Sequence, residues 1–389
     1  MRILLATEYF PESETGEITG GVESRAFYAA RQLAKKQKVF ILTSRRPGSK
    51  RVDSFSSLNI IRLGPEYGYS QSGHLLRRLL FSINAALSAR RLAHKERIDV
   101  IDGYSFLTYP AAIWTALFSK TRGFLTYHEV WVGSWAKNTG TSKGFFGELL
   151  ERVVLFKAKL GSLRFISVSN FTKDQLVRQG IPNERIKVIS NGVTLSDYTK
   201  LKTQKARQPT VCFVGRLTKN KNVEDLILAA AELRKKITGL KVLIIGSGPE
   251  EDTLKKLAAE KKLEGIVEFA GFLPSHKEVL KRLKASTVFC SPSIVEGFGI
   301  TLVEAIASGV PYVCSDIPPF VEISGKAGGR EKGGLLFRQG NAEDLADKLH
   351  RLLADKALYE RCIEEEKKLC LRYDWAAIAS QIEEAYSGK

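Results

Sequence analysis

The chain has 389 residues, of which 44% are apolar and 26% are charged, and this composition excludes a disordered or fibrous protein. The length allows two domains of ordinary size, each with its own core. The formal net charge of +18 lies mostly in the first half and favours an anionic partner, which could be nucleic acid, acidic lipid or a phosphorylated substrate.

Short β-branched runs alternate with helical patterns along the chain, which indicates parallel sheets with crossover helices. The strands predicted in the first half span residues 2–7, 39–44, 59–63, 98–102, 123–128 and 164–169. The strands predicted in the second half span residues 210–215, 240–246, 267–271, 288–291, 311–315 and 334–337. Six strands in each half predict an α/β protein with two Rossmann-like, doubly wound sheets.

A polar, basic segment without apolar periodicity, residues 194–210, separates the halves. It predicts a first domain of residues 1–193 and a second of residues 194–374. The last helical stretch, residues 375–389, has an apolar face that needs a surface to cover, and either domain could supply it.

The sequence shows neither a membrane-spanning nor a signal-peptide pattern. No apolar stretch is long enough to cross a bilayer, and the N-terminus enters a strand without a signal-peptide pattern. The five cysteines are scattered and include no C-x-x-C pair, which favours free thiols in a reducing compartment. These features predict a cytoplasmic protein.

Ligands of open parallel sheets bind beyond the carboxyl ends of the strands, so the residues there are the candidates for a site. In "VGRLTKNKN", Arg216 follows a predicted strand directly and Lys221 comes five positions later. A guanidinium and an ammonium together suit a diphosphate. An exposed basic loop without function would look the same.

The segment "EGFGITLVEAIASGVP" adds two carboxylates to this edge of the sheet. Glu296 precedes a helix that starts near Ile300, and Glu304 lies within its apolar run, where an unpaired charge would cost several kcal/mol. Gly297 and Gly299 allow a tight turn, and the helix N-terminus offers amide hydrogens to an oxygen ligand. We expect a polar partner for Glu304 and predict that it holds the vicinal hydroxyls of a sugar or ribose.

The first half offers weaker signals. Gly20 and Gly21 start a helix after the first strand, as a phosphate-binding turn would, and His128 ends a strand in "YHEVW". The sequence has no P-loop, no full G-x-G-x-x-G in this turn, no H-E-x-x-H and no Asp-x-Asp. A zinc protease is therefore excluded, and nucleotide hydrolysis, dinucleotide redox chemistry and a simple metal site lose support.

Taken together, "GGVE", "YHEVW", "VISNGV", "VGRLTKNKN", "IIGSGP", "AGFLP" and "EGFGITLVEAIASGVP" resemble the retaining glycosyltransferases of family 4 over nearly the whole chain. The resemblance implies the GT-B fold, in which two Rossmann-like domains face each other across a cleft. The carboxyl-terminal domain would hold a nucleotide-diphosphate sugar, the amino-terminal domain would take the acceptor, and helix 375–389 would cross back to the amino-terminal domain.

The resemblance also implies residue roles. Arg216 and Lys221 would bind the diphosphate, Glu304 the ribose, and Glu296 the transferred sugar, with His128 beside the reacting sugar. The catalytic residues so implied are His128, Glu296, Arg216 and Lys221. The donor-binding residues so implied are Gly21, Arg216, Lys221, Gly271, Phe272, Leu273, Glu296, Phe298, Gly299, Ile300 and Glu304. Two positions depart from the family pattern: Thr194 stands where an acid is usual, and Glu129 where aspartate is common.

The predicted reaction is transfer of a hexose-type sugar, with retention and without cofactor or metal, to a lipid-linked or cell-envelope glycan. A GT-B epimerase and a non-catalytic sugar-nucleotide sensor remain as alternatives. A phosphorylase would need a Schiff-base lysine that the sequence does not identify. A nucleic-acid partner is not expected, because no nucleic-acid module is recognisable and the carboxylates would repel phosphodiesters.

The acceptor half also suggests a membrane partner. Residues 130–154 carry Trp131, Trp135, Phe145 and Phe146, and basic residues cluster at 44–51 and on Arg77, Arg78, Arg90 and Arg91. The aromatic residues could seat at a membrane surface or pack into the core. The first interpretation predicts peripheral contact with the acidic inner face of the plasma membrane.

Overall fold

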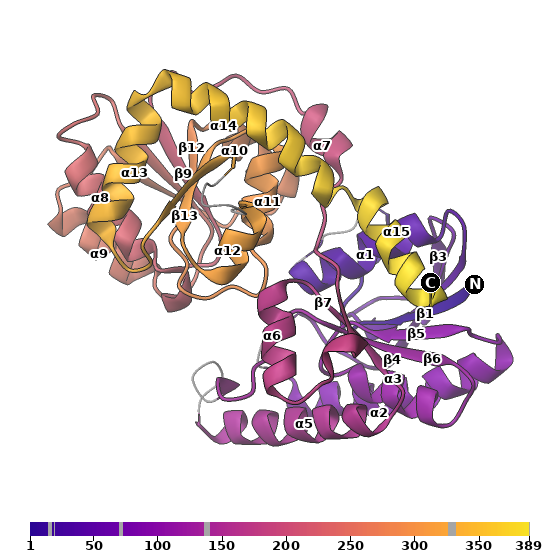
Figure 1. The fold of residues 1–389 in the computed structure, drawn as a ribbon. Coiled ribbons are helices and arrows are strands. Elements are labelled where there is room, and N and C mark those ends of the chain that lie inside the picture. The colour runs from indigo at the N-terminus through magenta and orange to yellow at the C-terminus, as the bar shows by residue number, and fades with distance from the viewer. Residues whose placement is uncertain (15–17, 19, 70–72, 136–140, 326–331, 389) are drawn as a thin grey trace. The chain divides into compact units, whose positions relative to one another are not determined.

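A computed structural model describes residues 1–14, 18, 20–69, 73–135, 141–325 and 332–388. The chain forms two compact α/β units, one of residues 1–191 and 375–389 and the other of residues 192–374 (Figure 1). The expected boundary after Val193 lies two residues beyond this division. None of the helices within the described ranges has both the length and the apolar character needed to cross a bilayer.

The first unit is built on an eight-stranded sheet in the order β3-β4-β2-β1-β5-β6-β7-β8, in which only the β3–β4 pair is antiparallel. The strands are β1 (Arg2–Ala6), β2 (Lys38–Arg45), β3 (Val52–Phe55), β4 (Leu58–Glu66), β5 (Val100–Gly103), β6 (Arg122–Tyr127), β7 (Arg164–Ser167) and β8 (Ile186–Val188). All six strands predicted for the first half are present, but the prediction was incomplete. It missed β3, a partly exposed edge strand with polar residues, and β8, which is too short to show a pattern.

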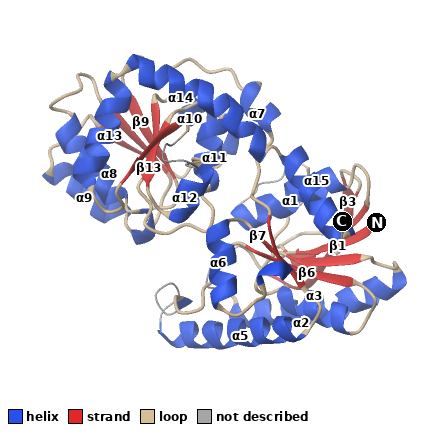
Figure 2. Cartoon of the chain, viewed as in Figure 1, coloured by secondary structure: helices blue, strands red, loops and turns tan. Residues whose placement is uncertain are grey.

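Helices cover both faces of this sheet (Figure 2). The helices of the unit are α1 (Gly21–Leu33), α2 (Leu75–Lys95), α3 (Tyr109–Leu117), α5 (Thr141–Leu160), α6 (Asn170–Arg178) and α15 (Trp375–Ser387), with a short 3₁₀ turn η1 (Asn183–Arg185). Successive side chains of β1 point to opposite faces of the sheet. Ile3 and Leu5 pack in the core beneath α1 and α15, whereas Leu4 and Ala6 pack in the core beneath α2, α3 and α5.

The C-terminal helix α15 packs on α1 within the first unit. The ring of Trp375 stacks on Tyr28 with 5.9 Å between centroids, and the hydroxyl of Tyr386 donates a 2.6 Å hydrogen bond to Oδ2 of Asp102. Thr126 donates to the same oxygen at 2.7 Å. The apolar face of the last helix therefore covers the first unit, and a fully buried carboxylate anchors it.

We predict that Asp102 makes the stability of the first unit depend on pH. Burial raises the pKa of Asp102 to about 6, although hydrogen bonds from Tyr386 and Thr126 and the charge of Arg25 lower it. The folded protein thus holds this proton more tightly than the unfolded chain, so its stabilising effect is complete below about pH 4 and lost as pH rises through 6. Relative to Asp102→Asn, the wild type should lose about 3 kcal/mol of unfolding free energy across this range.

Urea unfolding followed by tryptophan fluorescence measures this effect, because all four tryptophans lie in the first unit. The exposed Asp174 supplies the control: Asp174→Asn should show no such trend against the wild type. A pH-independent difference between the wild type and Asp102→Asn would contradict the role given to the buried carboxylate.

The second unit is built on a six-stranded, all-parallel sheet in the order β11-β10-β9-β12-β13-β14. The strands are β9 (Thr210–Val214), β10 (Lys241–Ile245), β11 (Val267–Gly271), β12 (Val288–Ser291), β13 (Tyr312–Ser315) and β14 (Gly334–Phe337). All six predicted strands are confirmed. The strand order reverses between β9 and β12, and the carboxyl ends at such a reversal are where doubly wound sheets bind ligands.

The helices of the second unit are α7 (Leu195–Thr199), α8 (Val223–Leu233), α9 (Glu251–Glu260), α10 (His276–Ala285), α11 (Ile300–Ala307), α12 (Pro318–Ile323), α13 (Ala342–Ala354) and α14 (Lys356–Leu369), with 3₁₀ turns η2 (Lys219–Lys221) and η3 (Cys370–Tyr373). The interpretation of residues 194–210 as connection alone is wrong, because this segment includes α7 and buries Tyr198. Four of the five cysteines are buried, and no disulfide joins cysteines in the described part of the chain.

Candidate functional site

The loops after β9 and β12 meet at the point where the strand order of the second sheet reverses. Lys221 lies in η2 after β9, and its ammonium forms an ion pair with Oε1 of Glu296, which follows β12. The amide of Ile294 also donates to the carbonyl of Asn220 at 2.8 Å. Arg216 lies in the same loop as Lys221, close to the end of β9, and is exposed. The structure therefore joins two of the predicted catalytic residues directly.

Glu296 is held by a second donor. The hydroxyl of Ser293 donates to Oε1 of Glu296 at 2.9 Å, and Ser293 is itself buried next to Ser291 and Ser315, whose hydroxyls contact it. The Glu296 carboxylate is mostly shielded from solvent, so these partners fix its position. Sequence reasoning missed Ser293; its place at the end of a strand, three residues before Glu296, was the available signal.

Glu304 has the polar partners that its apolar surroundings require. His276 lies 2.8 Å from Oε1 of Glu304 through its Nε2, and the hydroxyl of Tyr198 donates to the same oxygen at 3.3 Å. Desolvation lowers the pKa of His276, but the hydrogen bond and charge of Glu304 raise it, and the net effect is a rise. These partners come from α10 and α7, and sequence reasoning identified neither.

The start of α11 depends on a glycine. Gly299 has φ +100° and ψ 55°, and a Cβ at this position would stand 2.5 Å from Cε1 of Phe320. A larger residue would therefore be strained and would clash. Phe298 before it is buried and packs edge to face with the ring of Tyr373. The amides of Leu302 and Val303 donate to the carbonyl of Gly299, so the helix itself leaves the amides of Ile300 and Thr301 without an acceptor. The contact of these amides with a donor stays a prediction.

Two further glycines bring neighbouring loops together. A Cβ on Gly246 would lie 1.9 Å from the carbonyl oxygen of Gly215, and one on Gly248 would lie 2.2 Å from that of Leu217. The amide of Gly246 donates to the carbonyl of Gly271 at 2.8 Å. The loops after β9, β10 and β11 are thus closely packed, and side chains larger than hydrogen would separate them.

Gly271, Phe272 and Leu273 follow β11 at the same edge of the sheet. Gly271 has φ +66° with open space beside its Cα, and Phe272 is exposed. Leu273 is partly buried. Their expected contacts with a nucleotide base stay a prediction.

Gly21, in the first unit, is the first residue of α1, and Gly20 caps the helix in an extended conformation. A Cβ on Gly21 would meet no atom within 4 Å, so packing inside the protein does not require glycine there. The open space is compatible with the close approach of a ligand that the resemblance implied.

His128 follows β6 in the first unit. Its ring is partly exposed, but Nε2 is buried and has no hydrogen-bond partner among the described residues. Burial lowers the pKa of His128 to about 3, and the charge of Arg25 adds to this effect. The imidazole is therefore neutral at neutral pH, and Nε2 can exchange a hydrogen bond with a ligand.

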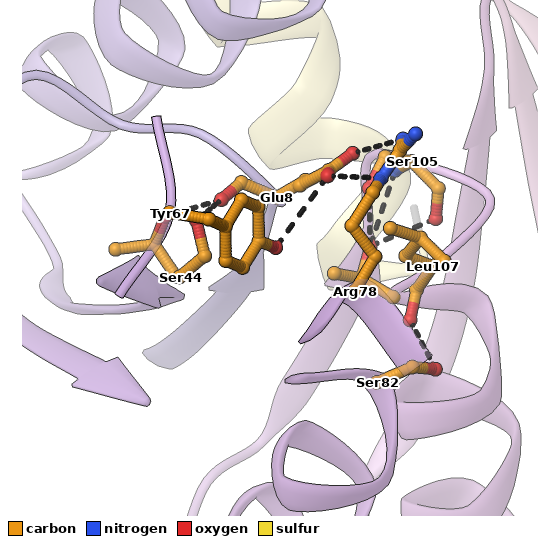
Figure 3. Close-up of polar contacts among 9 residues, drawn as sticks. Glu8, Ser44, Tyr67, Arg78, Ser82, Ser105 and Leu107 are labelled. Atoms are coloured by element: carbon orange, nitrogen blue, oxygen red, sulfur yellow. Dashed lines mark hydrogen bonds and ion pairs between the residues drawn. The ribbon is translucent and has the colours of Figure 1, made fainter. Parts of the chain in front are cut away.

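A further polar cluster, which sequence reasoning missed, lies at the carboxyl edge of the first sheet (Figure 3). The carboxylate of Glu8, two residues after β1, accepts hydrogen bonds from Nε and Nη2 of Arg78 on α2, at 2.7 and 2.8 Å. The hydroxyl of Tyr67 donates to Glu8 at 3.5 Å, and Ser44 contacts the Glu8 carbonyl. Burial raises the pKa of Glu8, although Arg78 lowers it.

Comparison with known families agrees with this architecture. The sequence model of the family "Glycosyl transferases group 1" matches residues 198–369, and that of "Glycosyltransferase Family 4" matches residues 19–197. The fold and the two models define a glycosyltransferase-like protein of two Rossmann-like units. The chain belongs to glycosyltransferase family 4.

Curated relatives match parts of the chain. A putative colanic acid biosynthesis glycosyltransferase, WcaL of Escherichia coli K12, is 32% identical over 194 residues, which are 47% of this chain and 46% of that protein. A GDP-mannose:cellobiosyl-diphosphopolyprenol alpha-mannosyltransferase of Xanthomonas oryzae is 28% identical over 312 residues, which are 78% of this chain and 76% of that protein. The chain spans about half the length of WcaL and of several other curated relatives that it matches.

Solved structures share the fold. Sucrose-phosphate synthase from Thermosynechococcus elongatus superposes with a TM-score of 0.78 at 19% identity, covering 100% of this chain and 99% of that one. HepE from Anabaena in complex with UDP-glucose superposes with a TM-score of 0.72 at 19% identity, covering 100% of both chains. These likenesses confirm the predicted GT-B fold.

Proposed function

We propose that the protein transfers a hexose-type sugar from a nucleotide-diphosphate sugar to a lipid-linked or cell-envelope glycan. The observation that supports this most is the joining of Lys221 and Glu296 where the strand order of the second sheet reverses. The sugar and the diphosphate of such a donor are directly linked, so the groups that hold them must be neighbours. The names of the E. coli, Xanthomonas and Anabaena proteins, with their colanic acid, diphosphopolyprenol and UDP-glucose, point the same way.

In the proposed site, Arg216, Lys221 and the start of α11 stabilise the charge that develops on the departing diphosphate. No metal ion or cofactor is needed for this step, because these groups supply the positive charge. Glu304 would hold the ribose hydroxyls through the carboxylate that His276 and Tyr198 orient. A ribose would therefore compete with His276 for the same oxygen.

We propose that the reaction proceeds with retention at the anomeric carbon. The acceptor hydroxyl would attack on the face from which the diphosphate leaves, and its proton would pass to the departing phosphate oxygen. Glu296 would hold the sugar hydroxyls. His128, neutral at working pH, would contact the sugar by a hydrogen bond and would not transfer the proton.

Thermal stabilisation by a panel of nucleotide sugars tests the proposal. A donor at a hundred times its dissociation constant adds about 2.7 kcal/mol of stability, which a melting curve resolves. The stabilising donor should then be hydrolysed slowly in the absence of acceptor. Conversion to a second nucleotide sugar would support an epimerase, and binding without turnover would support a sensor. If no nucleotide sugar stabilises the protein, the proposed function is wrong.

The proposed location is the cytoplasm, where nucleotide sugars are made and thiols stay reduced. Peripheral contact with the inner face of the plasma membrane would bring the protein to a lipid-linked acceptor.

A further inference from the structure

The helix layer formed by α2, α3 and α5 has an apolar outer surface. The inner sides of these helices build one core against the first sheet, with Phe81, Tyr109 and Leu155 among its members. Their outer sides would ordinarily be polar. They instead expose large apolar side chains on all three helices, which run together along one side of the unit (Figure 1).

The apolar outer residues follow the helical period. On α5 they are Phe145, Leu149, Val153, Phe156 and Leu160, spaced three or four residues apart, and their exposed fractions range from 47% to 71%. This spacing places them on one stripe of the helix. Since the opposite stripe is already in the core, α5 is apolar on two sides.

The other two helices extend the stripe. Leu76, Ile83 and Leu87 are exposed on α2, and Trp114 is exposed on α3, in contact with the exposed Phe118 just after that helix. The guanidinium of Arg90 on α2 lies 5.3 Å from the Phe118 ring. The apolar surface therefore continues from one helix to the next.

Charge on this surface has one sign. Helix α2 contains four arginines, one lysine and no acidic residue; Arg78 pairs with Glu8, whereas Arg90, Arg91 and Lys95 are exposed. The two acids of α5 are engaged elsewhere: Glu148 accepts hydrogen bonds from Arg152 and the amide of Gly133, and Glu151 is buried and bonded to Trp135. An apolar surface rimmed by cations is complementary to a bilayer with anionic headgroups.

The sequence left open whether the aromatic residues of segment 130–154 pack into the core or lie at a membrane surface, and the structure shows some of each. Residues 136–140 of this segment lie outside the described ranges. Trp135 packs against Phe106 and donates to Glu151, and Trp131 packs against Trp135, so these partly buried indoles are held against the unit by their own contacts. Phe145 and Phe146 are exposed, each at 66%. Of these four aromatic residues, the two phenylalanines are the more exposed, and their rings can reach a bilayer surface.

We propose that the α2–α3–α5 surface docks on an anionic lipid bilayer. The main competing occupant is a second copy of the chain, but pairing two such surfaces would bring their arginines together. A groove between α2 and the β3–β4 edge, with a volume of about 480 Å³, adjoins the surface at Leu80. Its walls include Leu63 and Leu80, and Arg45 and Arg51 line it. Arg45 is ion-paired with Glu66, so Arg51 would supply the cation for an acidic headgroup.

Co-sedimentation with vesicles tests the proposal. The wild type should bind vesicles of phosphatidylcholine with phosphatidylglycerol at moderate salt, and bind phosphatidylcholine alone at least about tenfold more weakly. Phe145→Ser combined with Phe146→Ser should lower binding on the order of a hundredfold, because two large apolar side chains no longer enter the bilayer. Arg91→Glu combined with Lys95→Glu should lower it on the order of tenfold or more.

The second unit supplies matched controls. Leu371→Ser removes a side chain of similar exposure, 63%, and Lys256→Glu with Lys261→Glu makes the same charge change, and neither should alter vesicle binding. All the changed side chains are exposed, so melting temperatures should stay the same. Three results would each overturn the proposal. The wild type could bind both kinds of vesicle equally, it could bind neither, or the phenylalanine variant could bind as well as the wild type. A wild-type dimer that the phenylalanine variant dissociates, without vesicle binding, would assign the surface to self-association instead.

Vesicle binding by this surface does not require transferase chemistry in the second unit. Donor binding by the second unit, measured without vesicles, should be the same in these variants and in the wild type. The two proposals can therefore fail separately.

Discussion

Replacing Lys221 by alanine is expected to lower sugar-transfer turnover by about 100- to 1,000-fold, the range found when one preorganised group that stabilises transition-state charge is removed. The ammonium of Lys221 is held in place by Glu296, so little reorganisation is needed when the diphosphate departs. Turnover should fall far more than stability, because Glu296 loses its cation but keeps the hydrogen bond from Ser293. Turnover with the donor identified by thermal stabilisation, measured under saturating acceptor, gives the result.

Lys219 is the matched control, because it lies on the same 3₁₀ turn and is exposed. Lys219→Ala should keep nearly full turnover. A second measurement needs no acceptor: the wild type should bind a nucleoside diphosphate far more tightly than the corresponding nucleoside, and Lys221→Ala should lose most of this difference. Undiminished transfer by Lys221→Ala would remove Lys221 from the site.

The sequence could predict that Lys221 and Glu296 lie close together, because each residue follows the carboxyl end of a predicted strand. Both residues follow strands with clear β-branched runs, and parallel strands place their carboxyl ends at one edge of a sheet. The partners of Glu304 could not be predicted in the same way. The sequence required some polar partner for a carboxylate in an apolar run, but Tyr198 lies 106 positions away on a short helix without apolar periodicity.

The outer surface of the first unit shows a second limit of sequence patterns. Helix α5 carries apolar residues on two opposite sides, and periodicity does not tell which side meets the sheet. The core side, with Val154, Leu155 and Ala158, is decided by packing against the first sheet. The same limit applies to Trp135 and Phe145, neighbouring aromatic residues of which one is packed and the other exposed.

Replacing Arg78 by methionine is expected to lower the unfolding free energy of the first unit by about 3–5 kcal/mol, because the change leaves the buried carboxylate of Glu8 without its cation. Arg77→Met on the same helix is the control: Arg77 is exposed and donates only to the Glu66 carbonyl, so its loss should cost less than about 1 kcal/mol. Urea unfolding followed by tryptophan fluorescence measures both.

Charge, and not lost packing, should account for most of the Arg78 effect. Glu8→Gln combined with Arg78→Met removes the unpaired charge and should regain most of the lost free energy. The single Arg78 variant should also recover on acidification. Burial already raises the pKa of Glu8, and loss of Arg78 raises it further, so the folded state takes up a proton more readily than the unfolded chain as pH falls. A deficit that is equally large at acid and neutral pH, or that persists in the double variant, would show that Arg78 stabilises the unit through its methylene packing.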